Sequence, residues 1–112
     1  MRALEITTQD ALTGPVLEVL GALDYDTAPE LRDLIAAVPL RPGQRLVIDL
    51  AGLEFCDSSG LTALIVARNH AHAVRAEIAL AAVPDHTLRL MNTTGLDRIF
   101  PLLPDREAAT RP

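Results

Sequence analysis

Short runs in which hydrophobic and polar residues alternate are separated along this chain by segments with helical spacing. Residues 4–7 and 16–20 alternate as strands do, and the Gly14-Pro15 pair between them predicts a turn. The two runs are therefore predicted to form a β-hairpin. Residues 45–50 contain an unbroken Leu-Val-Ile core, which is typical of a strand covered on both faces and indicates a central position in a sheet.

Three segments have the apolar spacing of helices. The first follows Thr27, a predicted N-cap with Pro29 in the first turn, and ends before Pro39. The second is predicted from about residue 59 to about residue 73. The third follows Pro84 and ends at Gly95, a residue suited to a helix C-cap. The residues predicted to face the core are Leu31, Leu34, Ile35, Val38, Leu61, Leu64, Ile65, Ala71, Val74, Leu88 and Met91.

Two further strands are predicted at residues 78–83 and 99–103. Because strands alternate with short helices, we expect an α/β fold built from βαβ units, with a mixed, mostly parallel sheet of about five strands. Residues 1–112 are expected to form a single domain with its core at about 4–103. The polar segment 104–112 is able to fray.

Composition narrows the possible functions. A length of 112 residues with 49% hydrophobic content suits one compact core. Fifteen acidic and ten basic residues give a net charge of -5 without any basic run, so direct nucleic-acid binding is not expected. Neither a signal-peptide pattern nor an apolar stretch of about 20 residues is present, so we expect no membrane span and a cytoplasmic protein. The single cysteine, Cys56, excludes an internal disulfide and agrees with a reducing compartment.

The most informative stretch is Asp57-Ser58-Ser59-Gly60, which follows a buried strand and a short acidic loop and begins a new helix. Hydroxyl groups in the first turn of a helix face solvent beside unpaired backbone N–H groups, and the helix dipole tolerates an added anion. Ser58 is therefore a candidate phosphorylation switch. The turn alone also fits a simpler role, in which Asp57 or Ser58 only caps the helix.

Four segments, in this order and spacing, resemble the STAS domain of bacterial anti-sigma-factor antagonists over about residues 4–103. They are residues 21–24 with Thr27-Ala28, residues 47–50, residues 57–61, and residues 94–97 followed by Phe100. The resemblance implies a STAS fold with helices packed mainly on one face of the sheet. Two departures affect expected contacts: Ala22 stands where the family commonly has glutamate, and the C-terminal segment is short.

The same resemblance implies a partner-switching cycle. In this cycle the antagonist binds an anti-sigma factor that is itself a serine kinase with a histidine-kinase-like ATPase domain, and a sigma factor is released. The kinase then phosphorylates the antagonist and switches it off, and a serine phosphatase reverses the modification. The kinase supplies the ATP site, so the antagonist is expected to need no cofactor and to catalyse no reaction.

By position, the resemblance assigns phosphorylation to Ser58, the first serine of the turn. It also places Asp24 beside that turn, where an ordinary turn carboxylate is the alternative. Steps of four residues from Ser58 reach Thr62 and Val66, and Asn69 lies three further on, so these residues are predicted to share one helix stripe. The predicted partner-binding residues are Asp24, Asp57, Ser59, Gly60, Thr62, Val66 and Asn69.

Other chemistry receives less support from the sequence. A Ser-His-Asp hydrolase is disfavoured because the turn is not a Gly-x-Ser-x-Gly elbow. His70 and His72 are two residues apart, so on a helix they diverge and cannot easily share a metal ion. Cys56 is expected to be a small buried hydrophobe. The alternative that stays open is a STAS scaffold that is not phosphorylated, as a subunit of a lipid-transport or signalling complex.

Overall fold

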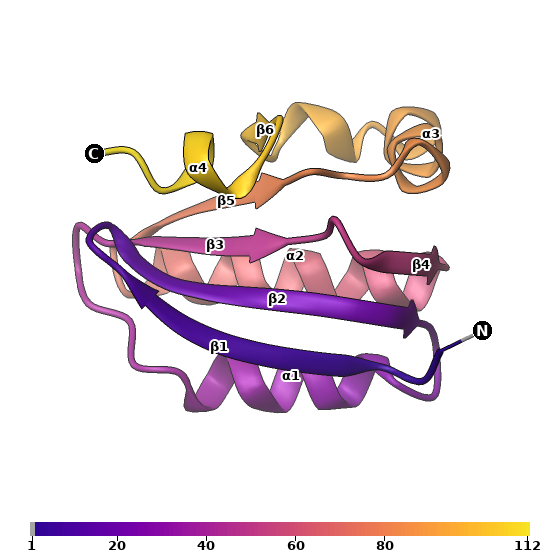
Figure 1. The fold of residues 1–112 in the computed structure, drawn as a ribbon, viewed down its shortest axis with the longest axis horizontal. Coiled ribbons are helices and arrows are strands. Elements are labelled where there is room, and N and C mark those ends of the chain that lie inside the picture. The colour runs from indigo at the N-terminus through magenta and orange to yellow at the C-terminus, as the bar shows by residue number, and fades with distance from the viewer. Residues whose placement is uncertain (1) are drawn as a thin grey trace.

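A six-stranded sheet with helices on both faces makes up the computed structural model, which describes residues 2–112 (Figure 1). The elements are β1 Glu5–Ala11, β2 Gly14–Leu23, α1 Ala28–Ala37, β3 Arg45–Asp49, β4 Leu53–Cys56, α2 Ser58–Ala73, β5 Glu77–Ala81, α3 Asp85–Thr94, the 3-10 helix η1 Leu96–Arg98, β6 Leu102–Leu103 and α4 Arg106–Ala109. The strand order is β1-β2-β3-β5-β6, and β4 pairs with β2 beyond the end of β3.

The sheet has the topology that the sequence predicts. β1 and β2 form an antiparallel hairpin in which Ile6 lies opposite Val19, and the other four pairings are parallel. Helices α1, α2 and α3 lie in the connections between parallel strands, as βαβ units require. The mixed, mostly parallel α/β fold and the central position of β3 are therefore confirmed.

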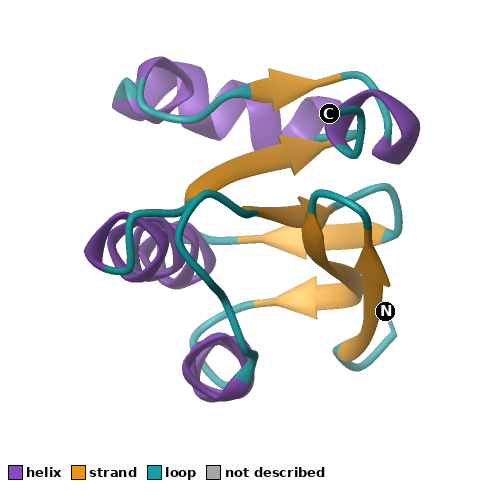
Figure 2. Cartoon of the chain, turned by 90° about the vertical axis from the view of Figure 1, so that its left-hand side faces the viewer, coloured by secondary structure: helices purple, strands orange, loops and turns teal. Residues whose placement is uncertain are grey.

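Alternate residues of β3 face two different apolar layers. Leu46 and Ile48 belong to the main core, together with buried residues of α1, α2 and α3. Val47 faces the other side, where it packs in a small cluster with Val16, Ala81 and Ala109 of α4. The unbroken Leu-Val-Ile run of β3 thus reflects burial on both faces, while most helical residues pack on one face, as expected (Figure 2).

Most residues predicted to face the core are buried. Four of them are only half-buried: three pack against the edge of the main core, and the fourth, on α3, is not part of it. These four are Leu34, Ile65, Val74 and Leu88.

Several local predictions were wrong in their boundaries. Gly14 and Pro15 begin β2, and the hairpin turn is made by Leu12 and Thr13 instead. The expected strand at 99–103 contains only Leu102–Leu103, because η1 occupies the chain immediately before it. Gly95 ends α3 in a left-handed conformation with φ of 79°, as predicted for this C-cap.

The sequence did not predict β4, whose residues were expected to form a loop. Leu53 and Cys56 are buried, whereas Glu54 and Phe55 between them are exposed, so the strand lacks strict alternation. These residues form a strand because they pair with β2, and the local sequence pattern does not indicate this pairing.

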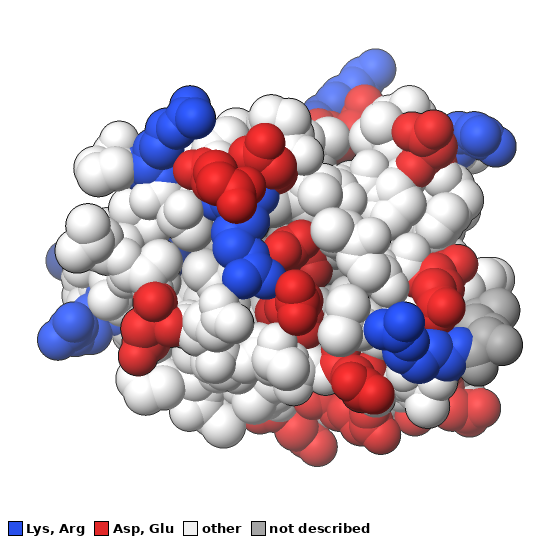
Figure 3. Space-filling view, viewed as in Figure 1, with Lys and Arg blue, Asp and Glu red and all other residues white. Residues whose placement is uncertain are grey.

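The composition of residues 104–112 predicts a segment that is able to fray. In the structure this segment contains the short helix α4. The Arg106 guanidinium binds three strands at once: Nε donates to Asp49 Oδ2, Nη1 to Gln9 Oε1 and Nη2 to Glu18 Oε2, each at 2.9 Å. Arg45 Nη1 donates to the carbonyl oxygen of Ala109 at 2.8 Å. These bonds hold α4 against the second face of the sheet, where basic and acidic side chains are interleaved (Figure 3).

We expect Arg106→Met to lower the free energy of unfolding by about 1.5–3 kcal/mol, measured by urea denaturation. The physical reason is that Asp49 is only 5% exposed and would lose its ion pair with Arg106. Arg89→Met, at an exposed position of α3, is the matched control and should change stability by less than about 0.5 kcal/mol. Equal stabilities of the two variants would contradict the prediction.

Candidate partner-binding site around Ser58

The site is built on the turn between β4 and α2. Asp57 has an extended backbone, and its Oδ1 accepts a hydrogen bond from the N–H of Gly60 at 3.1 Å. The N–H of Leu61 donates to the carbonyl oxygen of Asp57 at 3.1 Å, which begins the helical hydrogen bonding. Asp57 is therefore the residue that caps α2, and the Ser58 side chain is not needed for this role.

Ser58 is the first residue of α2, and it is exposed. Its carbonyl oxygen accepts a hydrogen bond from Thr62 Oγ1 at 3.0 Å. Among residues 2–112 its hydroxyl group makes no hydrogen bond, and neither do the backbone N–H groups of Ser58 and Ser59. Ser59 is half-buried, so the hydroxyl group at Ser58 is the more accessible of the two.

Gly60 brings the start of α2 against the ends of β2 and β4. A Cβ atom at this position would lie 2.7 Å from Cys56 Sγ and 2.7 Å from the carbonyl oxygen of Leu23. That carbonyl oxygen also accepts the N–H of Asp57 at 3.3 Å. The buried Gly60 therefore fixes the backbone from which Ser58 projects, while its predicted part in partner binding stays a prediction.

Asp24 closes the loop between β2 and α1. Its Oδ1 accepts hydrogen bonds from the N–H groups of Asp26 at 3.0 Å and Thr27 at 3.1 Å. Thr27 occupies the predicted N-cap position, but its hydroxyl group lies 2.9 Å from the carbonyl oxygen of Ala22 and makes no capping bond to α1. Thr27 is thus the N-cap residue of α1, as predicted, but its side chain braces the loop together with Asp24 and does not form a capping bond.

A hollow of about 370 Å³ lies between the N-terminal ends of α1 and α2. The residues around it are Tyr25, Asp26, Ala28, Pro29, Arg32, Ser59 and Thr62. The hollow brings the loop of Asp24 together with the predicted residues Ser59 and Thr62. Sequence reasoning missed Tyr25, which is 78% exposed, and Arg32; the signal available was a tyrosine between two aspartates in a chain with only three aromatic residues.

The predicted stripe on α2 is exposed. Ser58, Thr62, Val66 and Asn69 all face solvent, and the Val66 side chain is 37% exposed. The opposite side of α2 carries small and branched residues that are fully buried. These are Ala63, Leu64, Ala67 and Ala71. The geometry of the stripe is therefore confirmed, while its part in partner binding stays a prediction.

Cys56 lies directly beneath the turn and is buried. Burial, and secondarily the charge of Asp57, raises the pKa of its thiol to about 12. The thiol is therefore neutral near pH 7, and it packs against the position of Gly60 as a small hydrophobe.

The fold and this turn can now be compared with known proteins. The family model described as "Mlab, STAS domain" matches residues 6–104. A solved anti-sigma factor antagonist from Mycobacterium paratuberculosis is 31% identical, with a TM-score of 0.81 and coverage of 96% of this chain and 91% of that chain. The anti-sigma-B factor antagonist of Listeria monocytogenes is 30% identical over 82 residues, which are 73% of this chain and 72% of that protein.

The unphosphorylated form of the anti-sigma factor antagonist SpoIIAA has the same fold, with a TM-score of 0.64, 22% identity and coverage of 92% of this chain and 88% of that chain. The chain thus belongs to the STAS family, and several of its relatives are named as anti-sigma-factor antagonists. Within residues 2–112, no helix is long and apolar enough to cross a membrane.

We expect Gly60→Ala to lower the free energy of unfolding by about 1–3 kcal/mol, because the new methyl group would overlap the Leu23 carbonyl oxygen and Cys56 Sγ. Thermal or urea unfolding followed by circular dichroism measures the change. Ser59→Ala, one residue earlier in the same turn, is the control and should alter stability by less than about 0.5 kcal/mol. A fully stable Gly60→Ala protein would show that the close approach does not constrain the turn.

Proposed function

We propose that this protein is an anti-sigma-factor antagonist that binds an anti-sigma serine kinase, releases a sigma factor, and is switched off by phosphorylation at Ser58. The observation that supports the proposal most directly is the exposed Ser58 hydroxyl group at the start of α2. Because Asp57 caps the helix, Ser58 can be modified without the loss of a capping bond.

Electrostatics explains how a phosphate would act at this turn. It adds about 1.5–2 negative charges near neutral pH. Within the domain, the free N–H groups of Ser58 and Ser59 and the positive end of the helix dipole offset part of this charge. Across an interface, the same phosphate lies beside the carboxylate of Asp57 and adds to the negative charge that a partner meets. Phosphorylation should therefore weaken partner binding more than it weakens folding.

The partner would cover the hollow between α1 and α2 as well as the α2 stripe. Asp24 holds the loop that presents Tyr25 on one side of the hollow, and Thr62 lies on the other. Tyrosine side chains often contribute a large share of binding energy at protein interfaces, because they bury much area at little entropic cost. In this proposal a serine phosphatase restores the binding-competent form.

A STAS scaffold subunit of a lipid-transport or signalling complex is the second candidate function. The observation that favours it is the description of the matched family, which names Mlab and not an anti-sigma-factor antagonist. Such a subunit would use the exposed α2 face for assembly without phosphorylation. Incubation with the kinase and ATP separates the two candidates.

We expect the cognate anti-sigma kinase to phosphorylate Ser58, as read by mass spectrometry of the peptides spanning the turn. Ser58→Ala should abolish the modification, whereas the control Ser59→Ala should retain it. Ser58→Glu should weaken kinase binding at least about tenfold, or roughly 1.4 kcal/mol, with little change in thermal stability. Stoichiometric phosphorylation of Ser58→Ala within the turn would refute the assignment.

We expect Val66→Asp to reduce kinase affinity by about 1–3 kcal/mol, because a charge would replace an apolar contact in the interface. Titration calorimetry measures the affinity, and circular dichroism checks that the variant is folded. Ile99→Asp is the control, because Ile99 is 38% exposed, nearly the same as Val66, and lies outside both the α2 stripe and the hollow. Unchanged affinity of a folded Val66→Asp protein would place the interface elsewhere.

A further inference from the structure

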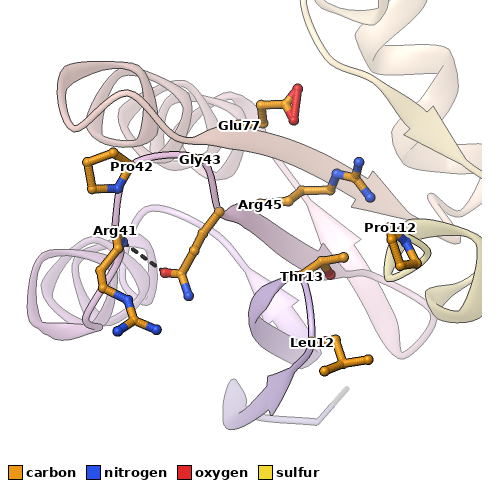
Figure 4. Close-up of a pocket in the computed structure, with 9 residues that line it drawn as sticks. Leu12, Thr13, Arg41, Pro42, Gly43, Arg45, Glu77 and Pro112 are labelled. Atoms are coloured by element: carbon orange, nitrogen blue, oxygen red, sulfur yellow. Dashed lines mark hydrogen bonds between the residues drawn. The ribbon is translucent and has the colours of Figure 1, made fainter.

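Three hollows that share lining residues lie at the end of the domain opposite Ser58. Figure 4 shows the residues that line the central hollow. The central hollow, of about 750 Å³, shares Leu12 and Arg41 with one neighbour of about 680 Å³. It shares Arg45 and Glu77 with another of about 380 Å³. We call these three hollows together the arginine groove.

The arginine groove is a basic region of an acidic protein. Arg41, Arg45 and Arg111 line it, and the acidic residues that line it are Asp10 and Glu77. The whole chain, in contrast, has ten basic and fifteen acidic residues. The lining therefore carries one more positive than negative charge, three against two, whereas the whole chain carries a net charge of -5.

Most of these cations have no partner in the structure. Within residues 2–112, the guanidinium groups of Arg41 and Arg111 make no hydrogen bond or ion pair. Arg45 binds only backbone carbonyl oxygens, so its charge is not neutralised. Arg75 is exposed and borders the groove through its backbone, because its carbonyl oxygen accepts the N–H of Gly43 at 2.9 Å and Gly43 lines the central hollow.

Apolar and backbone groups accompany the charges. Leu12 is 97% exposed in the β1–β2 turn, and Pro39, Pro42 and Pro101 line the hollows. A single exposed leucine is common on protein surfaces, but here it borders a groove lined by arginines. β1 is an edge strand, so the outer backbone groups at this side of the groove are free to pair with an added strand.

We propose that the arginine groove binds an extended, acidic peptide segment of a partner protein that also carries large apolar side chains. Carboxylates would meet the free guanidinium groups, and an apolar side chain would pack against Leu12 and the prolines. The hollows suit an extended chain better than a flat lipid surface, because a chain can follow all three hollows in turn. Since α2 spans 16 residues, or about 24 Å, between the two ends, the groove can be occupied independently of Ser58.

Fluorescence anisotropy with a labelled peptide of repeated Glu-Asp-Leu and Glu-Asp-Phe units, in low-salt buffer, tests this proposal. We expect saturable binding that weakens as salt is added, and none with a peptide in which lysine replaces every acidic residue. Arg41→Gln combined with Arg75→Gln should weaken binding about fivefold or more, and Leu12→Ser about threefold. Arg89→Gln, an exposed arginine on α3, is the matched control and should bind as the unmodified protein does.

Ser58→Glu should also leave peptide binding unchanged. The proposal of a peptide-binding groove can therefore be confirmed or refuted independently of the proposed switch at Ser58. Absence of saturable binding would overturn the proposal, and so would equal affinity of the Arg41→Gln/Arg75→Gln protein. Vesicles of phosphatidylcholine and phosphatidylserine are the final comparison. If the protein does not bind the peptide but sediments with these vesicles, and if this sedimentation depends on Arg41 and Arg75, the groove binds a membrane surface and the peptide proposal is overturned.

Discussion

The close approach of α2 to the ends of β2 and β4 is the contact on which the site depends. At Gly60 the separation is too small for a side chain, because a Cβ atom would overlap the Leu23 carbonyl oxygen and Cys56 Sγ. This contact fixes where the helix begins, so Asp57 caps it and Ser58 emerges into solvent at its first turn. A site that is read by a partner gains specificity when its backbone is held by packing rather than by the partner itself.

The second face of the sheet is secured by a different kind of interaction. Arg106 joins β1, β2 and β3 through Gln9, Glu18 and Asp49, and the short α4 places Ala109 over Val47. A helix of four residues is too short to be stable by itself. Its order therefore comes from tertiary contacts with residues between 57 and 97 positions away in the sequence.

The difference between local contacts and contacts across many residues of sequence explains how much could be predicted from the sequence. The hairpin, the central strand and the three long helices have local patterns, and the DSSG turn marks the start of α2 with an error of one residue. β4 has no such pattern, since Leu53 and Cys56 are ordered by pairing with β2. α4 has only a short local signal, the Asp105 N-cap, and nothing local indicates that Arg106, one arginine among ten, reaches three strands. Tyr25 and Arg32 share a hollow with Ser59 only because the packing of α1 against α2 brings them there. The turn was predictable, whereas the shape of the surface around it was not.

The close packing of α2 against the sheet indicates how a switch at Ser58 would work. Small residues, Ala63, Ala67 and Ala71, let the helix lie close against the sheet, and each is fully buried. Close packing of this kind resists small displacements, because a shift must open a cavity or create overlap. A phosphate at the exposed first turn would therefore change the charge and shape that a partner meets, without the need for a rearrangement of the core. In such a domain the energy of switching lies at the interface, and the fold provides a fixed support for it.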